Sequence, residues 1–447
     1  MSKEKLTPLN SNTLTAFRRR LYACFLGAGD ALMNAADALS SETSAQSFVE
    51  LSLSPCFERR WPSLYDAFED AQIDREALLG LLADFAPKPP TGSRLLLGVD
   101  ASSIARPSSG TAKDRTYVQA SNLPEGAKPV VAGWQFSTLA LLPEVCGSWT
   151  YVLDNRRIKS EQTQAEVAAC QLEEATPFLP ADALLVGDGY YGSLTFLQLT
   201  DGLPCDKLLR FAKNRLLYRP APPRPPKPGR GAPKKDGPAF KCKDAQTHGT
   251  PDASWEGHDA NGQYVEVAVW RNLHCKQARQ ITVALLRVTR QGAQDTKRDP
   301  KVSWFLLVGQ TLPALAAIVP LYARRYSLEH GFRVDKQDLL WEKARLRSPE
   351  QFQNWTDSVA CVRNQLCLAR ELAATRQPWE RKERPATPSQ VRRAMGGILR
   401  QLGTPARPSQ VRGKSPGRKR GAIIEKAPRY KVIFKDTDKA KKTRKVV

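Results

Sequence analysis

Several features that define common protein classes are missing from this sequence of 447 residues. Its nine cysteines form no CxxC pair and no regular framework, and only four histidines are present. The spacing of Cys242, His248, His258, His274 and Cys275 matches no standard zinc finger, so structural roles are expected for them. There is no Walker-type glycine loop leading into Lys and Ser/Thr, and no GxSxG elbow. ATP use and Ser/His/Asp hydrolysis therefore lack support.

The sequence also lacks a signal-peptide pattern and a long apolar run. The start, MSKEKLTPLN, leads into no apolar core segment. The most apolar stretch, 303–322, is broken by Gln310, Pro313 and Pro320. This pattern predicts a core strand followed by a helix rather than a membrane span. We therefore expect a cytoplasmic protein with reduced thiols and no membrane partner.

Positive charge is abundant and unevenly distributed. The formal net charge of +23 favours a polyanionic partner such as DNA, and hence a nucleoid-associated location. A solvated basic surface is the alternative interpretation. Residues 381–447 hold 21 Lys or Arg against 4 Asp or Glu, whereas the first ninety residues hold 9 basic and 12 acidic side chains. We predict that 377–447 form a flexible basic tail that becomes ordered on nucleic acid.

Hydrophobic periodicity divides the rest of the chain into four parts. Residues 1–90 are predicted to form a helical domain, with Pro and Gly residues at its end. Residues 91–218 alternate strands and a helix, which predicts a mixed α/β layer. Residues 219–310 combine a Pro-rich basic loop with a small antiparallel β-rich insertion. The strands expected in that insertion cover 263–275, 280–288 and 302–309. Helical periodicity resumes in 311–376.

Two aspartates stand at the ends of strands that we expect to be buried. Asp100 ends LLLGVD, and Asp188 ends LLVGD. Strand ends fix a side chain while the following loop leaves it accessible, and two such carboxylates can share a hard cation such as Mg²⁺. For either residue alone, a turn or helix-capping role is an equally good interpretation. Asp154 also follows a strand-like run and is the main competitor.

The segment 322–336, YARRYSLEHGFRVDK, gathers further groups suited to phosphodiester chemistry. Tyr322, Arg325, Glu329 and Lys336 follow one another at offsets of three, four and seven, which on a helix bring all four near one face. That face presents a carboxylate for a metal ion, two cations for phosphate, and a phenol that can hydrogen-bond phosphate. An exposed helix with ordinary charge pairs is the alternative.

The same four residues resemble the YREK motif of bacterial insertion-sequence transposases of the DDE type. GVDAS around Asp100 and GDGYYG around Asp188 are similar to the two Asp motifs of that family. Further similarity lies in FAKNRLLY, GRGAPKKDG and TPARPSQVRGKSPGRKRG, so that it extends from about 95 to 421. The chain departs from the family at DGYY, where many relatives have Arg after the Asp, and at Tyr326, where Trp is frequent.

This resemblance implies a fold and a metal site. The expected fold class is α/β: an RNase H-like mixed sheet flanked by helices, with the β-rich insertion between the second Asp and the Glu. Asp100, Asp188 and Glu329 would hold two Mg²⁺ ions, with Mn²⁺ able to substitute. The enzyme would act as a homodimer in a synaptic complex, on transposon ends and on target DNA.

Relatives of this kind pass through a DNA hairpin in which a flipped base stacks on a Trp. Trp304 matches the place of that Trp, in an aliphatic strand shortly before Tyr322. A Trp packed in the core is an equally good interpretation of Trp304. Trp255 and Trp270 are weaker candidates for the same role.

Basic residues outside the motifs are candidates for sequence-independent phosphate contacts. Those in and near the Pro-rich loop are Arg230, Lys234, Lys235, Arg215, Arg219, Arg224 and Lys227. Those in the tail are Arg418, Lys419 and Arg420. A solvated linker is an equally good interpretation of the loop. In relatives the N-terminal domain recognises the element end, and here its one basic cluster is Arg18, Arg19 and Arg20.

Together these features predict a DDE transposase that cleaves and rejoins DNA in cut-and-paste transposition of its own insertion sequence. Two alternatives stay open: a domesticated DNA-binding protein that no longer cuts, and a site-specific nuclease without strand transfer. The intact set Asp100, Asp188 and Glu329 argues against the first alternative. Joined product in a plasmid assay would exclude the second.

Overall fold

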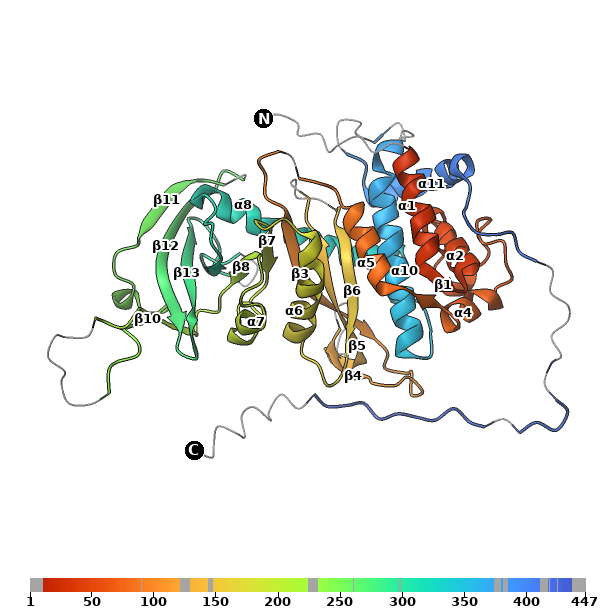
Figure 1. Ribbon diagram of the computed structural model, residues 1–447, viewed down its shortest axis with the longest axis horizontal. Coiled ribbons are helices and arrows are strands. Elements are labelled where there is room, and N and C mark those ends of the chain that lie inside the picture. The colour runs from red at the N-terminus through yellow and green to blue at the C-terminus, as the bar shows by residue number, and fades with distance from the viewer. Residues whose placement is uncertain are drawn as a thin grey trace.

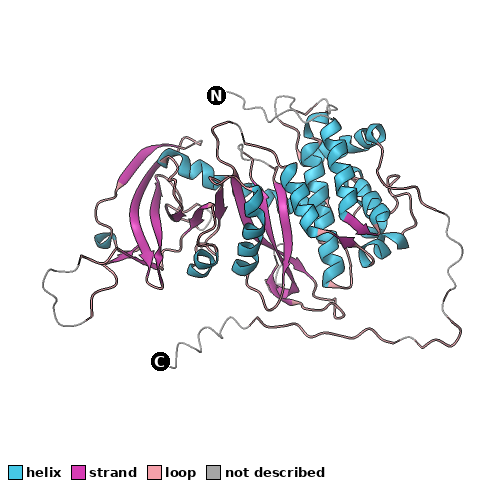
Figure 2. Cartoon of the chain, in the orientation of Figure 1, coloured by secondary structure: helices cyan, strands magenta, loops and turns pink. Residues whose placement is uncertain are grey.

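A computed structural model describes most of the chain. The described residues are 11–89, 91–120, 129–143, 148–223, 232–259, 261–296, 299–373, 379–380, 385–410, 417, 419–423 and 425–435. Figure 1 shows helices gathered at one end of an elongated molecule, a sheet through its middle, and a β-rich part at the other end. Figure 2 shows the same division by secondary structure.

The N-terminal residues form the helical end, as their periodicity predicted. Its helices are α1 (Ser11–Cys24), α2 (Gly29–Ser41), α3 (Phe48–Leu51), α4 (Pro62–Glu69) and α5 (Arg75–Asp84), with the short pair β1 (Phe25–Gly27) and β2 (Gln72–Ile73). Leu14, Phe17 and Leu21 recur at helical spacing on α1 and are fully buried. None of the described helices combines the length and the apolar character that crossing a bilayer requires.

The core of the sheet is five strands with mixed pairing. They are β3 (Leu96–Ala105), β5 (Val130–Leu141), β6 (Tyr151–Ile158), β7 (Leu184–Gly187) and β8 (Asp206–Arg210). In space they run β6, β5, β3, β7, β8. The first three are antiparallel neighbours, whereas β3, β7 and β8 are parallel. The short strand β4 (Thr116–Gln119) pairs with the outer part of β5.

Parallel pairing requires crossover segments, and two helices supply them. α6 (Gln164–Ala175) lies between β6 and β7, and α7 (Leu194–Leu199) lies between β7 and β8. Thr163 begins α6 with a capping box to Glu166, which satisfies N–H groups of its first turn. Alternate residues of β7 pack into two different apolar clusters, Leu185 in one and Leu184 in the other. The sheet is therefore covered on both faces, which is why its strands are continuous apolar runs.

The β-rich end joins this core edge to edge. Its strands are β9 (Leu216–Tyr218), β10 (Ala239–Lys241), β11 (Ala253–His258), β12 (Tyr264–Cys275), β13 (Ala278–Arg290) and β14 (Val302–Val308). The last three are the strands that the sequence predicted. Because β14 pairs antiparallel with β8, all these strands belong to one twelve-stranded sheet rather than to a separate layer.

The helical part expected over 311–376 is divided into several separate segments. α8 (Ile318–Ala323) and α9 (Tyr326–Arg333) are followed by a π-helical turn, Val334–Asp338. Leu340 then has a φ of 54°, and the long α10 (Pro349–Leu368) begins after Ser348 caps it. α10 contacts β6 as well as α2, so it connects the sheet with the N-terminal helices.

The flexible tail predicted for 377–447 is wrong for part of its length. α11 (Pro388–Leu402) is a capped helix that packs on α2 and α10. Val391, Met395 and Leu399 are buried on one face of it, at a spacing that the high content of Lys and Arg concealed. Further along, Ile433 forms a parallel bridge with Thr116 at the edge strand β4.

Candidate active site

The parallel pair β3 and β7 brings two aspartates side by side. Val99 of β3 is in register with Gly187, the last residue of β7. Asp100 directly follows Val99, and Asp188 directly follows Gly187. The two aspartates are therefore neighbours at this end of the β3–β7 pairing. Asp188 Oδ1 accepts a hydrogen bond of 2.9 Å from the Tyr190 N–H, and Asp100 Oδ1 accepts one of 2.8 Å from the Ala101 N–H.

The helix that carries the third carboxylate packs closely on β3 at Gly98. A Cβ atom added at Gly98 would lie 2.8 Å from Leu328 Cδ1 of α9, so a larger residue there would push against this leucine side chain. Leu328 is buried, and Glu329 next to it is half exposed at the rim of the site. This packing brings Glu329 towards the strand that carries Asp100.

Arg325 links the two carboxylates that these elements bring together. Its Nη1 donates to Asp100 Oδ2 at 2.9 Å, and its Nη2 donates to Glu329 Oε1 at 2.8 Å. Arg325 stands at the break between α8 and α9, directly before the first residue of α9. The break therefore allows its guanidinium to reach across to β3.

The electrostatics of Asp100 reflect an excess of negative charge. Burial raises the pKa of this carboxyl, Arg325 opposes the rise, and Asp188 and Glu329 add to it, so that the pKa reaches about 6. Burial also raises the pKa of the Tyr322 phenol, and Arg325 opposes that rise. Three carboxylates share one guanidinium here, which leaves a site that attracts a further cation.

The carboxylate oxygens of Asp100, Asp188 and Glu329 suit a hard divalent cation, although these side chains are not arranged for binding one in this structure. Within the described residues, no three His, Cys, Asp or Glu side chains are already placed to hold a metal ion. Arg325 lies between Asp100 and Glu329 and pairs with both. All three acidic groups supply only oxygen ligands, which Mg²⁺ and Mn²⁺ prefer.

A comparison with protein families identifies the family of this chain. A family model described as DDE superfamily endonuclease matches residues 20–276, which is more than half of the chain. The chain belongs to the DDE superfamily of endonucleases. The expectation of a DDE-type enzyme is thus confirmed. Asp100 and Asp188 lie inside the matched segment of this DDE endonuclease, and Glu329 lies beyond it.

Among solved structures, the DDE endonuclease is similar to piggyBac transposase in a synaptic complex with hairpin DNA. The two chains are 10% identical, with a TM-score of 0.44, and the likeness covers 92% of this chain and 88% of the other. Among curated proteins, none matches the sequence.

The other residues of the four-residue motif flank the carboxylates of the DDE endonuclease. Tyr322 lies on α8, Glu329 on α9 and Lys336 on the π-helical turn, while Arg325 lies at the break between α8 and α9. The four residues are therefore not on one straight helix, which corrects the sequence prediction. The ring of Tyr322 packs against that of Phe305, with 4.6 Å between the ring centroids. The Arg325 guanidinium lies 6.0 Å from the centroid of the Tyr322 ring. Lys336, on the π-helical turn, donates from Nζ to the carbonyl oxygen of Ser103 on β3 at 3.0 Å.

A buried ion pair fixes the turn that carries Lys336. Arg363 of α10 donates to Asp335 Oδ1 at 2.8 Å and to the Gly331 carbonyl at 2.5 Å, and both charged side chains are almost fully buried. A Cβ at Gly331 would lie 2.5 Å from the Arg363 guanidinium, so the glycine is needed for this contact. Arg363 thereby positions the end of α9 relative to β3.

Trp304 lies in an aromatic core, not at the site. Its side chain is 5% exposed, and its ring packs against those of Phe240, His248 and Trp270. The packed-core interpretation therefore describes Trp304, and Trp270 is equally buried. His248 bonds through Nε2 to the Lys241 carbonyl, in keeping with a structural role.

The basic residues singled out from the sequence lie in different environments. Arg230 falls outside the described residues, whereas Lys234 and Lys235 are exposed on the segment that leads to β10. The N-terminal cluster is not a free cationic surface. Arg18 is buried and pairs with Asp37 at 2.5 Å, and Arg20 pairs with Asp84 at 2.7 Å. Of the three, only Arg19 is exposed and makes no ion pair with another described residue.

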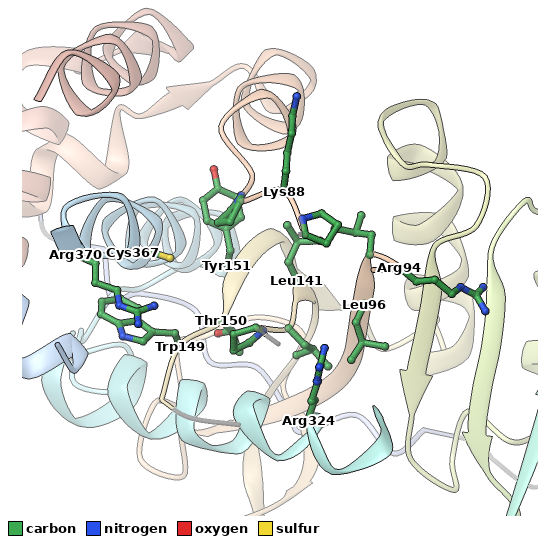
Figure 3. Close-up of a pocket in the computed structure, with 15 residues that line it drawn as sticks. Lys88, Arg94, Leu96, Leu141, Trp149, Thr150, Tyr151, Arg324, Cys367 and Arg370 are labelled. Atoms are coloured by element: carbon green, nitrogen blue, oxygen red, sulfur yellow. The ribbon is translucent and has the colours of Figure 1, made fainter. Parts of the chain in front are cut away.

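A separate pocket lies on the other side of the α8–α9 break. It holds about 560 Å³ of space, its open mouth included, and apolar residues such as Leu96, Leu141 and Trp149 line it (Figure 3). Arg324 also lines this pocket, whereas its neighbour Arg325 contacts Asp100. The pocket is therefore distinct from the carboxylate cluster.

Tyr190 is a residue near the site that sequence reasoning did not single out. It lies in the unusual DGYY segment and places an exposed ring two residues after Asp188. The neighbouring Tyr191 is fully buried. Two adjacent tyrosines carry no periodic signal, so only the fold distinguishes them.

Proposed function

We propose that this DDE endonuclease is a transposase that cleaves and transfers DNA strands in cut-and-paste transposition of an insertion sequence. The observation that carries the proposal is the gathering of Asp100, Asp188 and Glu329 around Arg325, on neighbouring elements of one site. Each of these residues comes from a different part of the chain. Their meeting therefore depends on the whole fold.

The sheet order supports an RNase H-like catalytic domain. Three antiparallel strands, β3, β5 and β6, are followed by β7 and β8, which add in parallel on the other side of β3. The β-rich strands β9 to β14 are inserted between β8 and the helix that carries Glu329. This is the order that the sequence resemblance implies for the catalytic domain and its insertion.

The three carboxylates are the residues that would hold the metal ions. Two Mg²⁺ or Mn²⁺ ions at such a site activate the attacking water or 3′-hydroxyl and stabilise the leaving oxygen. Arg325 keeps Glu329 and Asp100 close together and neutralises part of their repulsion. Its guanidinium, the Lys336 ammonium and the Tyr322 hydroxyl are the groups of the motif suited to binding the phosphates around the cleaved bond.

The charge distribution supports DNA as the substrate. The net charge is +23, and Lys234 and Lys235 lie exposed on the segment that leads to β10, where we expect them to contact phosphate. From the sequence alone, Arg230 is proposed for the same role. A transposase must hold two element ends at once, so we propose a homodimer in the complex with DNA and a place in the bacterial nucleoid.

The decisive test is strand cleavage by Glu329→Gln. The substrate is a supercoiled plasmid that carries the inverted repeats flanking the gene, with Mg²⁺ or Mn²⁺ added. We expect wild-type protein to nick, excise and rejoin the element, and Glu329→Gln to lose these activities while it still binds DNA. Glu173→Gln, on the exposed face of α6, is the matched control and should cut normally.

Three outcomes would contradict the proposal in different ways. Undiminished cutting by Glu329→Gln would remove the assignment of the site. Cleavage by the wild type without any joined product would indicate a nuclease without strand transfer. Binding without cleavage at either metal would indicate a DNA-binding protein that has lost catalysis.

A further inference from the structure

An exposed aromatic ring stands beside the carboxylate cluster and has no part in the chemistry described so far. Tyr190 is the second residue after Asp188, and 45% of its surface is exposed. Single exposed apolar residues are common on proteins, so exposure alone says little about function. The way in which this ring is held is more informative.

The Tyr190 ring is fixed at two points. The Tyr190 backbone N–H donates to Asp188 Oδ1 at 2.9 Å, which ties the residue to that carboxylate. The buried ring of Tyr191 packs edge-on against the Tyr190 ring, with 5.7 Å between centroids and an angle of 78°. With 45% of its surface exposed, Tyr190 keeps part of its ring available to a ligand.

The loop that carries the ring is itself clamped. A Cβ atom at Gly192 would lie 2.1 Å from the Arg210 carbonyl oxygen, so only glycine allows this crossing of the two segments. Arg215 donates from Nη1 to the Gly192 carbonyl oxygen. Tyr191 is tied from the other side, because its hydroxyl accepts from Gln164 Nε2 at 2.9 Å. A ring on so constrained a loop loses little entropy when it binds a partner.

The surroundings favour a nucleotide as that partner. Lys213 is exposed on the turn that Arg215 ties to Gly192, two residues after Tyr190, so this turn offers a cation for a phosphate of the same strand. Every nucleobase has a flat π-face that stacks on an aromatic side chain, whatever its sequence. A strand whose phosphate lies at Asp188 brings the next base within reach of a ring two residues away.

We infer that Tyr190 is a stacking platform for the base of the nucleotide that adjoins the cleaved phosphate. The inference rests on the proposed function, because it takes Asp188 to be the place where that phosphate binds. Tyr190 is then a positioning residue. By holding the base it fixes the strand, and thus the phosphate, relative to the three carboxylates.

The ring and the hydroxyl of Tyr190 can be tested separately. Tyr190→Phe and Tyr190→Trp keep an aromatic face, whereas Tyr190→Leu keeps bulk and apolar character but removes the π-face. If the hydroxyl acted instead, by capping α6 or by contacting phosphate, Tyr190→Phe would behave like Tyr190→Leu. Phe178→Leu is the matched control, because Phe178 is exposed to a similar degree, 47%, and lies past the far end of α6.

The experiment uses full-length protein and a duplex of the element's own terminal repeat, with 2-aminopurine next to the cleaved phosphate. Ca²⁺ replaces Mg²⁺ so that binding is measured without cleavage. Stacking quenches 2-aminopurine, so we expect strong quenching with wild type, Tyr190→Phe, Tyr190→Trp, Phe178→Leu and Glu329→Gln. We expect Tyr190→Leu to lose the quenching and to bind about tenfold more weakly, with its circular dichroism unchanged.

The outcomes separate this inference from the proposed function. Full quenching by Tyr190→Leu would overturn the platform, as would loss of quenching in Tyr190→Phe. If Glu329→Gln cut DNA normally while the Tyr190 variants behaved as expected, the catalytic assignment would fail and the platform would stand. In Mg²⁺, Tyr190→Leu should raise KM more than it lowers kcat, and Tyr190→Trp should restore both.

Discussion

Two clusters of carboxylates lie along this sheet, and they differ in how many cations accompany them. In the candidate active site, Asp100, Asp188 and Glu329 share one guanidinium, that of Arg325. In the second cluster, on β6, α6 and α10, the three acidic residues share two arginines. Its members are Asp154, Glu174, Asp357, Arg75 and Arg156.

The second cluster has a structural role, because its ion pairs hold helices against the sheet. Arg75 of α5 pairs with Asp154 at 2.7 Å and with Asp357 of α10 at 2.5 Å, so it joins the N-terminal helices to the sheet. Arg156 pairs with Asp154 at 3.1 Å and with Glu174 at 2.5 Å. Asp154, the competitor for a metal-binding role, thus has both oxygens occupied by arginine. These ion pairs favour a structural role for Asp154.

The largest effect is expected from neutralising Asp188. Asp188→Asn should lower strand cleavage at least about a thousandfold, because it removes a ligand that the two ions would share. Its melting temperature should stay the same or rise, since like charges no longer repel. Asp154→Asn should do the reverse: it should lower the melting temperature and leave cleavage per folded molecule intact. Equal loss of cleavage in both variants would erase the distinction between the clusters.

A substitution of Arg75 tests directly how much these ion pairs stabilise the fold. Arg75→Met should lower the free energy of unfolding by about 3 kcal/mol, because Asp357 is left buried without its cation. Urea unfolding followed by circular dichroism gives this value. Arg19→Met, at an exposed position of α1, should change it by less than about 0.5 kcal/mol. A similar loss in both variants would mean that Arg75 acts only through general charge.

Added metal ions should raise the melting temperature by binding at the candidate active site and not at the second cluster. With Mg²⁺ or Mn²⁺ at about a hundred times its dissociation constant, wild-type protein should melt roughly 5 °C higher, because the ions bind only the folded chain. Asp154→Asn should show the same increase from its own lower starting point. Asp188→Asn should show almost none. An increase that persists in Asp188→Asn would place the ions elsewhere.

The smallest effect concerns pH and Glu174. A hydrogen bond from Arg156 holds the pKa of Glu174 below its ordinary value. The pair therefore adds stability at neutral pH, and this contribution is lost as the pH falls through the lowered pKa. Glu174→Gln should cost less than about 1 kcal/mol at pH 7, since the pair is partly exposed, and should cost less at pH 3 than at pH 7. Urea unfolding at the two values measures the difference, and an equal cost at both would exclude the ion pair as its source.

Some parts of the fold follow from local pattern. Apolar runs that end in Asp100 and Asp188 predicted β3 and β7, and alternation predicted β12, β13 and β14. α11 was missed because its lysines and arginines dominated the composition, although Val391, Met395 and Leu399 keep helical spacing. The break between α8 and α9 was missed as well, since neither Arg324 nor Arg325 is a helix breaker.

By itself the sequence determined the set of side chains that we propose for the chemistry, namely Asp100, Asp188, Glu329, Arg325 and Lys336, together with the apolar runs that predict strands before the two aspartates. Only the tertiary structure decided which aspartate has too few cations around it, that Trp304 is packed in a core, and that Tyr190 stays exposed beside Asp188. The physical reason is that burial and counter-charge depend on contacts between residues far apart in the chain. A single strand or helix pattern contains no record of those contacts.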